Sequence, residues 1–390
     1  LGPARNYKFR LYPTHQQEQK LVETLDGCRW LYNHFLSKDL SKEDLQFALT
    51  ELKEHKPWLR NYHSKMLQMV IHKIDSARKA LTTLRKKGYK TGKSYYLTHE
   101  KYNSFTYNQS GFRIQRHGKT DLLWLSNIGY IAIRLHRPVK NIKQITICRR
   151  IDKWYAFVCC ELSKPIFKFL NPNKSIGIDV GITKFIHDSD NLAIENPLFL
   201  NKIVKPLKRS SRKMARRKKG SQNHKKAKTR LQILHERIRN KRNDFLHKIS
   251  SYYSKQYDVV FLERLHVLNM VKNSYLARYI LDSGWRKFKQ LLEYKAKMIV
   301  EVEPKNTTIN CHRCGNKVPK TLAIRIHKCD VCGLAIDRDY NASMNILQGG
   351  LLLLPVVRRE FTPVEIECRS KKQENIGFPI DSRVLFKPFQ

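Results

Sequence analysis

Two Cys-x-x-Cys motifs separated by fourteen residues constrain this chain more than any other feature. Each motif is followed by a glycine, Gly315 or Gly333, which lets the backbone turn around the sulfurs. Four thiolates at this spacing form the tetrahedral ligand set of a structural zinc ion, and two paired motifs disfavour the alternative of a redox dithiol. The predicted ligands of one structural Zn²⁺ are Cys311, Cys314, Cys329 and Cys332. Because both motifs are intact, we expect His312 and His327 to be bystanders.

The charge balance predicts a polyanionic partner. The 390 residues carry 76 Lys and Arg against 33 Asp and Glu, a formal charge of +43. Neutralising many phosphates releases counterions and gives strong, salt-dependent binding, so nucleic acid is the leading partner. We expect no membrane partner, because no apolar run approaches the roughly 20 residues that span a bilayer. Nine cysteines, four of them in the paired motifs, and an opening stretch without a secretory pattern lead us to expect a cytoplasmic location.

One short apolar run holds a single acid near its centre. The run is Ser175-Ile-Gly-Ile-Asp179-Val-Gly-Ile182, and its β-branched residues indicate a strand buried on both faces. An unpaired carboxylate in such a strand costs several kcal/mol, so we expect Asp179 to be paired, protonated or bound to a metal ion. RNase H-like nucleases begin their metal site in this way. From this stretch alone, a strand-end Asp that caps a turn is an equally good interpretation.

Two more acids stand alone beside apolar segments. Glu263 ends the run Asp258-Val-Val-Phe-Leu-Glu263, although a strand-terminal Glu is commonplace. Asp339 follows the second Cys motif, and the apolar spacing after it allows the alternative that Asp339 is only a helix N-cap. Three lone acids beside a zinc motif in a basic chain favour a metal site, because clustered carboxylates bind hard divalent ions. Two Mg²⁺ ions roughly 4 Å apart can activate water and stabilise the leaving oxygen of a phosphodiester.

The N-terminal part alternates between strands and helices. Residues 5–13 alternate apolar and polar side chains and predict a strand, after which Thr14 and Gln17 form a capping box that starts a helix. A second helix is expected to begin near Asn61 or Ser64. From 104 to 162, short alternating segments predict a small barrel, which we expect the first strand to close.

The segment 205–248 holds eighteen Lys and Arg against two acids. A helical stripe of apolar residues runs through its later part, and like charges at this density repel one another unless an anion neutralises them. We therefore expect a helical insertion that lies along nucleic acid. The predicted contacts are Lys208, Arg209, Arg212, Arg216, Arg217, Lys218, Lys225, Lys226, Arg230, Arg237, Arg239 and Arg242.

The order of these motifs resembles the TnpB nucleases of bacterial and archaeal insertion sequences, the RNA-guided relatives of type V CRISPR effectors. The resemblance covers about residues 5–347. It is carried by Gly177-Ile-Asp179-Val-Gly181, Phe-Leu-Glu263, the two Cys motifs and Asp337-Arg-Asp339-Tyr-Asn341-Ala. Further matches are Lys8-Phe-Arg-Leu-Tyr-Pro13, Tyr32-Asn-His-Phe35, Ser104-Phe-Thr-Tyr107, Leu135-His-Arg-Pro138, Asn240 to His247 and Asn269-Met270.

The resemblance implies a function and its site. Asp179, Glu263 and Asp339 would form the RuvC triad that binds two Mg²⁺ ions, or Mn²⁺ in their place. The barrel and the helical unit would hold a guide RNA from the transposon end and read a short motif flanking a double-stranded DNA target, while base pairing supplies sequence specificity. The sequence does not give the oligomeric state, for which a monomer is favoured, and the expected location is the prokaryotic cytoplasm in association with the nucleoid.

The predicted fold is α+β and multidomain. An RNase H-like (RuvC) α/β nuclease domain carries a zinc-ribbon insertion, and a small oligonucleotide-binding-like wedge barrel is interrupted by a helical recognition unit. The expected parts are the first wedge strand 5–14, helical recognition domain 15–95, remaining wedge barrel 96–168, RuvC domain 169–305 with basic insertion 205–250, zinc ribbon 306–334, last RuvC segment 335–348 and a poorly ordered tail 349–390.

The predicted function is RNA-guided, Mg²⁺-dependent cleavage of DNA next to a flanking motif. One alternative is a guided DNA-binding regulator that no longer cleaves DNA. Loss of one or more of the three acids would indicate this alternative, and all three are present. The other is a transposase or accessory protein that acts without RNA, which the absence of a defined co-purifying RNA would mark.

Overall fold

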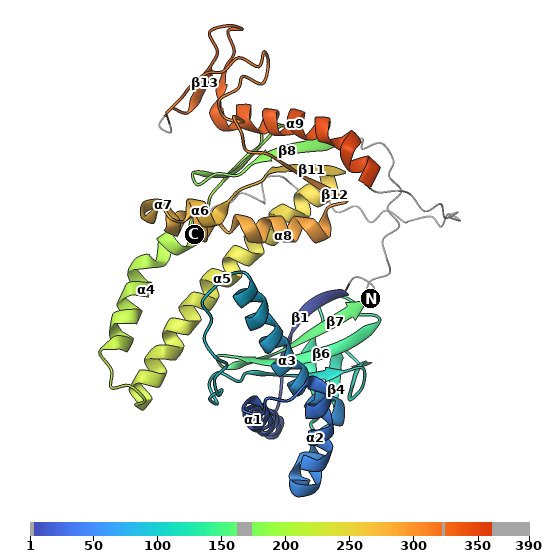
Figure 1. Cartoon of the computed structure of the whole chain (residues 1–390). Coiled ribbons are helices and arrows are strands. Elements are labelled where there is room, and N and C mark those ends of the chain that lie inside the picture. Colours follow the sequence, from blue (N-terminus) through green and yellow to red (C-terminus); the bar gives the residue numbers. More distant parts are fainter. Residues whose placement is uncertain (1–3, 162–173, 322–323, 361–390) are drawn as a thin grey trace. The chain divides into compact units, whose positions relative to one another are not determined.

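The computed structural model describes residues 4–161, 174–321 and 324–360 of the chain (Figure 1). These residues group into two compact units. The first takes in the described part of Leu1–Phe169 together with Val204–Arg239, and the second takes in the described parts of Leu170–Ile203 and Asn240–Gln390. Each unit has its own sheet and its own apolar core. Within the described residues, no helix is long and apolar enough to cross a membrane.

The first unit is built on a seven-stranded antiparallel sheet, in the order β2-β6-β7-β1-β5-β4-β3. Its strands are β1 (Ala4–Tyr12), β2 (Ser104–Asn108), β3 (Phe112–His117), β4 (Thr120–Leu125), β5 (Gly129–Arg134), β6 (Ile142–Arg150) and β7 (Lys153–Glu161). The prediction that the first strand joins the later ones is confirmed, because β1 pairs with both β7 and β5. Among the described residues, no ladder joins the edge strands β2 and β3, so closure into a barrel stays a prediction.

Alternation along β1 gives this sheet one apolar and one basic face. Phe9 and Leu11 are buried, whereas Lys8 and Arg10 point to the opposite face and are partly exposed. Helices from the segment after β1 complete the apolar core. They are α1 (His15–Leu36), α2 (Lys42–His55), the 3-10 helix η1 (Pro57–Asn61) and α3 (Ser64–Lys86).

The predicted starts of two of these helices are confirmed. Thr14 and Gln17 form the capping box of α1, and α3 begins at Ser64. Helix α2 was not predicted from the sequence, although Ser41 caps it by accepting from the backbone N–H of Asp44 at 3.1 Å. Only Leu45 and Leu49 of α2 are buried, which leaves a weak apolar stripe.

The second unit is built on a five-stranded mixed sheet, in the order β10-β9-β8-β11-β12. The strands are β8 (Ser175–Asp179), β9 (Lys184–Asp188), β10 (Ala193–Glu195), β11 (Val259–Glu263) and β12 (Met298–Val302). β8, β11 and β12 are parallel, and β9 and β10 extend the sheet in antiparallel fashion. The remaining helices are α4 (Phe199–Ala215), α5 (Gln222–Gln256), α6 (Val267–Met270), α7 (Ser274–Ser283), α8 (Trp285–Lys295) and α9 (Arg338–Glu360).

Helices cover both faces of this sheet (Figure 1). On β11, Val260 and Leu262 pack in a core shared with α8 and the second half of α5. Val259 and Phe261 point the other way, into a core shared with α9. This alternation is the expected pattern of a strand buried on both faces, and it decides toward which helix any side chain of β8 or β11 points.

Two glycines let the backbone of α9 lie directly on the sheet. A Cβ added to Gly177 of β8 would lie 2.3 Å from the backbone oxygen of Ser343, and one added to Gly350 would lie 2.1 Å from the ring of Phe261. The prediction that a poorly ordered tail starts at 349 is wrong for residues 349–360, which belong to α9. Leu354 of this part is buried in the core shared with β11. The rest of the predicted tail, residues 361–390, lies outside the described residues.

Replacing Gly177 tests the packing of α9. In Gly177→Ala the new methyl group would clash with the backbone of Ser343 and Leu347, which cannot move without shifting α9. We therefore expect the free energy of unfolding to fall by about 2 kcal/mol or more. Gly92→Ala is the matched control, because a Cβ there has no neighbour within 4 Å and the backbone is not left-handed. Chemical denaturation followed by circular dichroism measures both, and equal stability of the two variants would contradict the packing.

Candidate functional site

Two of the predicted acids end neighbouring parallel strands. Phe261 of β11 is in register with Gly177 of β8, and Leu262 with Ile178, so Glu263 and Asp179 come next on their strands. Since side chains alternate, both acids belong to the face that α9 covers. The carboxyl ends of parallel strands are where α/β folds gather functional groups.

The third acid lies in the first turn of α9. Asp339 is only 16% exposed, and Oδ1 of its carboxylate accepts from Nη2 of Arg338 at 3.1 Å. The alternative that Asp339 is the N-cap is wrong: Oδ1 of Asp337 accepts from the backbone N–H of Asp339 at 2.8 Å and of Tyr340 at 3.4 Å. Because Asp337 does the capping, the carboxylate of Asp339 is left for another role.

The three acids act on one another electrostatically. Burial, then the charges of Glu263 and Asp339, raise the pKa of Asp179 well above the ordinary value, and Arg338 acts in the opposite direction. Burial also raises the pKa of Glu263, although the hydroxyl of Thr307 lowers it. Raised carboxyl pKa values caused by burial and like charge are common at catalytic and metal sites. The predicted acids therefore lie near one another: Asp179 and Glu263 end adjacent strands, and Asp339 is close enough to raise the pKa of Asp179. Three carboxylates are a donor set that fits a hard divalent cation.

Two side chains of β9 hold the residue that caps α9. Nζ of Lys184 lies 2.8 Å from Oδ2 of Asp337, and Nδ1 of His187 lies 3.4 Å from its Oδ1. Although burial alone acts to raise it, hydrogen bonds from Lys184 and the backbone of Asp339 lower the pKa of Asp337. Sequence reasoning missed Asp337, Arg338 and Thr307 as parts of the site. The Asp-Arg-Asp spacing was a signal for the first two, and no sequence signal marked Thr307.

The structure brings the four predicted cysteines together. Their sulfurs all lie within 4.8 Å of one another, and they are the only such group of potential metal ligands within the described residues. The sulfurs of Cys311 and Cys332 are 3.6 Å apart, as are those of Cys314 and Cys329. His312 and His327 are outside this group, as predicted. The three carboxylates are not as tightly clustered as the sulfurs.

Both cysteine motifs have the same backbone turn. Gly315 donates to the carbonyl of Cys311 at 2.8 Å, and Gly333 donates to that of Cys329 at 2.9 Å. Both glycines have a positive φ, +75° and +71°, which explains the residue type at these positions. The backbone N–H groups of Cys332 and Val331 contribute to lowering the pKa of Cys329 to about 6, which favours the thiolate that a metal requires. The short strands β13 (Ile326–Lys328) and β14 (Ala335–Asp337) then lead into α9.

The predicted nucleic-acid contacts lie on the basic helices α4 and α5, except Arg216, Arg217 and Lys218, which lie between the two helices. Eleven of the twelve are exposed, and no ion pair of the described residues involves them. Arg242 differs from the others, because its guanidinium pairs with the carboxylate of buried Asp282. Asp282 would otherwise be a buried unpaired charge, and contact of Arg242 with nucleic acid stays a prediction.

Cations and aromatic rings also alternate on the polar face of the seven-stranded sheet. Nζ of Lys8 lies 3.9 Å from the ring centre of Tyr155, and the guanidinium of Arg10 lies 5.3 Å from the same ring. Arg150 lies 5.2 Å from the ring centre of Phe157. These cations are partly exposed, and basic groups beside aromatic faces are what single-stranded nucleic acid binds, through phosphates and stacked bases.

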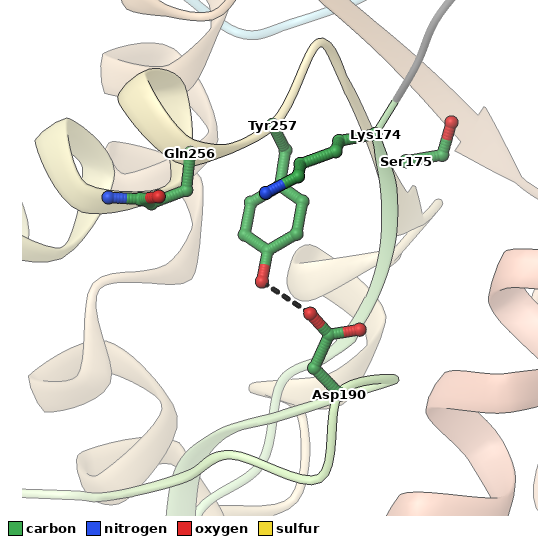
Figure 2. Close-up of a pocket in the computed structure, with 5 residues that line it drawn as sticks. All are labelled: Lys174, Ser175, Asp190, Gln256 and Tyr257. Carbon is green, nitrogen blue, oxygen red and sulfur yellow. Dashed lines mark hydrogen bonds between the residues drawn. The ribbon is translucent and has the colours of Figure 1, made fainter.

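A separate pocket of about 260 Å³ opens near the start of β8 (Figure 2). Lys174, Ser175, Asp190, Gln256 and Tyr257 line it. Its one carboxylate is already engaged, because Oη of Tyr257 donates to Oδ2 of Asp190 at 2.6 Å. The pocket lies at the amino end of β8, whereas Asp179 ends the strand, so it is not part of the acidic site.

Models of known families match most of the chain. One described as "Probable transposase" matches residues 157–274, and one described as "Cas12f1-like, TNB domain" matches residues 285–346. A third, described as "Helix-turn-helix domain", matches residues 4–41, which hold β1 and α1 in this structure.

Two relatives and one solved structure span most of the chain. "Putative RNA-guided DNA endonuclease" of Streptomyces pristinaespiralis is 31% identical, and the match covers 89% of each chain. "Putative RNA-guided DNA endonuclease InsQ" of Escherichia coli (strain K12) is 28% identical over 89% of this chain and 92% of its own. The solved structure described as the mini-RNA-guided endonuclease CRISPR-Cas_phi3 has a TM-score of 0.55, covering 90% of this chain and 92% of that chain. At 9% identity it shows a shared fold.

The cysteine cluster leads to a prediction about metal content. We expect one zinc ion per chain, and we expect Cys329→Ser to lower both the zinc content and the melting temperature, because a structural zinc contributes folding energy. Cys159→Ser is the control, since Cys159 lies in β7 outside the cluster. Elemental analysis of the purified variants measures zinc, and a wild-type chain that retains none would contradict the assignment.

Proposed function

The chain belongs to the TnpB family, related to the type V effectors, and from that premise we propose that it is the RNA-guided DNA endonuclease of a transposable element. One observation supports the proposal: Asp179 and Glu263 end adjacent parallel strands on the face that α9 covers, and Asp339 lies in the first turn of α9. The relatives named as RNA-guided DNA endonucleases support the same function.

We assign the three carboxylates to the binding of Mg²⁺ or Mn²⁺. The ions, when bound, supply activation of water and neutralisation of charge on a phosphodiester. The residues of the chain hold the carboxylates in place: Thr307 donates to Glu263, and Arg338 contacts Asp339. Burial and the neighbouring acids raise the pKa of Asp179, so a nearby cation would stabilise its ionised form.

The basic surfaces would hold the guide RNA and the DNA target. The exposed residues of α4 and α5 offer phosphate contacts, and the cation-aromatic face of the seven-stranded sheet offers contacts to single strands. Under the proposal, pairing between guide and target supplies sequence specificity, and the protein reads only the flanking motif. The four cysteines would hold a structural Zn²⁺ in a ribbon that contacts the target.

Two alternatives are outcomes of the same experiments. A guided regulator would bind RNA and target without cutting, and a transposase of another type would carry no defined RNA. Sequencing the RNA that co-purifies with the full chain distinguishes the second, because the proposal requires RNA of defined sequence from the end of the element.

Removing one acid tests the metal site. We expect Asp179→Ala to abolish guided DNA cleavage while RNA and target binding persist, since the carboxylate serves chemistry rather than recognition. Asp190→Asn, in the pocket of Figure 2, removes a carboxylate from the same unit and should cut at the wild-type rate. Cleavage assays and gel-shift binding with matched guide and target measure both. Wild-type cleavage by Asp179→Ala would overturn the assignment.

Salt dependence tests the basic helices. Replacing Lys225 and Lys226 with Gln removes two exposed charges, so the slope of log affinity against log salt for guide RNA should fall by about 1 to 2. Lys248→Gln on the same helix is the control, because Lys248 is already paired with Asp244 at 2.8 Å. Filter binding between about 50 and 200 mM salt measures the slopes. An unchanged slope in the double variant would place the RNA elsewhere.

A further inference from the structure

One buried hydroxyl reaches the acidic site from the loop that leads to the zinc-binding motifs. Thr307 lies between β12 and Cys311, and it is 7% exposed. Its Oγ1 donates to Oε1 of Glu263 at 2.6 Å. Glu263 is the last residue of β11, so its side chain extends beyond the sheet and depends on neighbours for its position. Thr307 is the side chain that provides this contact.

The loop that carries Thr307 is itself held by α9. Nδ2 of Asn345 donates to the carbonyls of Thr307 and Asn310, both at 2.7 Å. Nδ2 of Asn341 donates to Asn310 at 2.7 Å, and its Oδ1 accepts from the backbone N–H of His312 at 3.0 Å. Asn341 and Asn345 are one turn apart and lie on the same face of the helix that begins beside Asp339.

The hydroxyl and the backbone carbonyl of Thr307 therefore make different contacts. Its backbone carbonyl fastens the loop to Asn345, whereas its hydroxyl contacts Glu263. Asn310, held by the same helix, immediately precedes the first cysteine of the cluster, Cys311. The helix thus fixes Asp339, the first cysteine motif and, through Thr307, Glu263.

We propose that Thr307 is a positioning residue for Glu263, which holds the carboxylate in the orientation that a divalent cation requires. The proposal rests on the proposed function, because it concerns the metal site of the same three acids. A hydroxyl donor to one carboxylate oxygen leaves the other oxygen available and fixes the rotation of the group. Such partners of metal ligands typically change metal affinity or activity by about 10- to 100-fold when they are removed.

Thr307→Val and Thr307→Ser separate the hydroxyl from the packing. Val keeps the shape and the backbone contact to Asn345 but removes the donor, whereas Ser keeps the donor and removes a methyl. Thr308→Val is the matched control, because Thr308 is the exposed neighbour in the same loop. If Val lowers the melting temperature, Thr307→Ala removes the same hydroxyl without adding a methyl in its place.

The first measurement is binding of Mn²⁺ to the full chain, followed by the electron paramagnetic resonance signal of free Mn²⁺. Asp179→Ala defines the binding that belongs to the acidic site. We expect Thr307→Val to weaken that binding by about tenfold or more, and Thr307→Ser to restore it to within about threefold of wild type. Wild-type Mn²⁺ affinity in Thr307→Val would overturn the proposal, as would equal defects in Val and Ser.

The second measurement is guided cleavage as a function of Mg²⁺ concentration, with target binding measured in parallel. Thr307→Val should need more Mg²⁺ and cut about 10- to 100-fold more slowly at low Mg²⁺, while target affinity and the Thr308→Val control stay at the wild-type level. Loss of cleavage in Asp179→Ala with wild-type cleavage in Thr307→Val would overturn this inference and leave the proposed function standing. Wild-type cleavage in Asp179→Ala would overturn the proposed function itself.

Discussion

The packing of α9 against the five-stranded sheet is the contact on which the acidic site depends. The helix backbone approaches β8 so closely that only glycine fits at 177, and Gly350 serves the same purpose against Phe261. A helix held at two points along its length has little freedom to shift or rotate. Its first turn therefore stays beside the ends of β8 and β11, where Asp179 and Glu263 lie. The relative placement of Asp179, Glu263 and Asp339 thus depends on the absence of a side chain at two glycines, Gly177 and Gly350.

Gathering three carboxylates has an electrostatic cost, and the structure offsets it with neighbours of opposite charge. Arg338 contacts Asp339 and also lowers the pKa of Asp179, against the effect of burial and of the other two acids. Lys184 pairs with Asp337 instead, and Oδ1 of Asp337 accepts from the backbone N–H groups of Asp339 and Tyr340 at the start of α9. The two aspartates of the Asp-Arg-Asp stretch therefore have different roles: Asp337 caps α9, and Asp339 belongs to the acidic site.

The sequence predicted those features that have a short-range chemical cause. The cysteine cluster follows from the spacing of the thiols and from Gly315 and Gly333, and the capping box at Thr14 follows from two side chains three residues apart. Helix α2 was missed because its buried stripe is only Leu45 and Leu49. The end of α9 was misplaced because Gly349 and Gly350 resemble a helix stop. Their actual role is close packing, of Gly349 against Val302 of β12 and of Gly350 against Phe261 of β11, and contacts with such distant strands leave no local pattern.

The basic stretch 205–248 shows what a charge pattern in the sequence can predict and what it cannot. A basic stretch as a whole predicts a polyanionic partner, but it does not show which of its cations pairs within the fold. The pair of Arg242 with Asp282 was not predicted, because Asp282 lies forty residues later in the sequence. The same reasoning bears on the proposed chemistry. A phosphodiester and three carboxylates repel one another, so the acidic site can approach DNA only with cations between them. Under the proposed function, the exposed Lys and Arg of α4 and α5 would attract the polyanion. They belong to other elements than the acids do, so recruitment and cleavage would rest on separate residues.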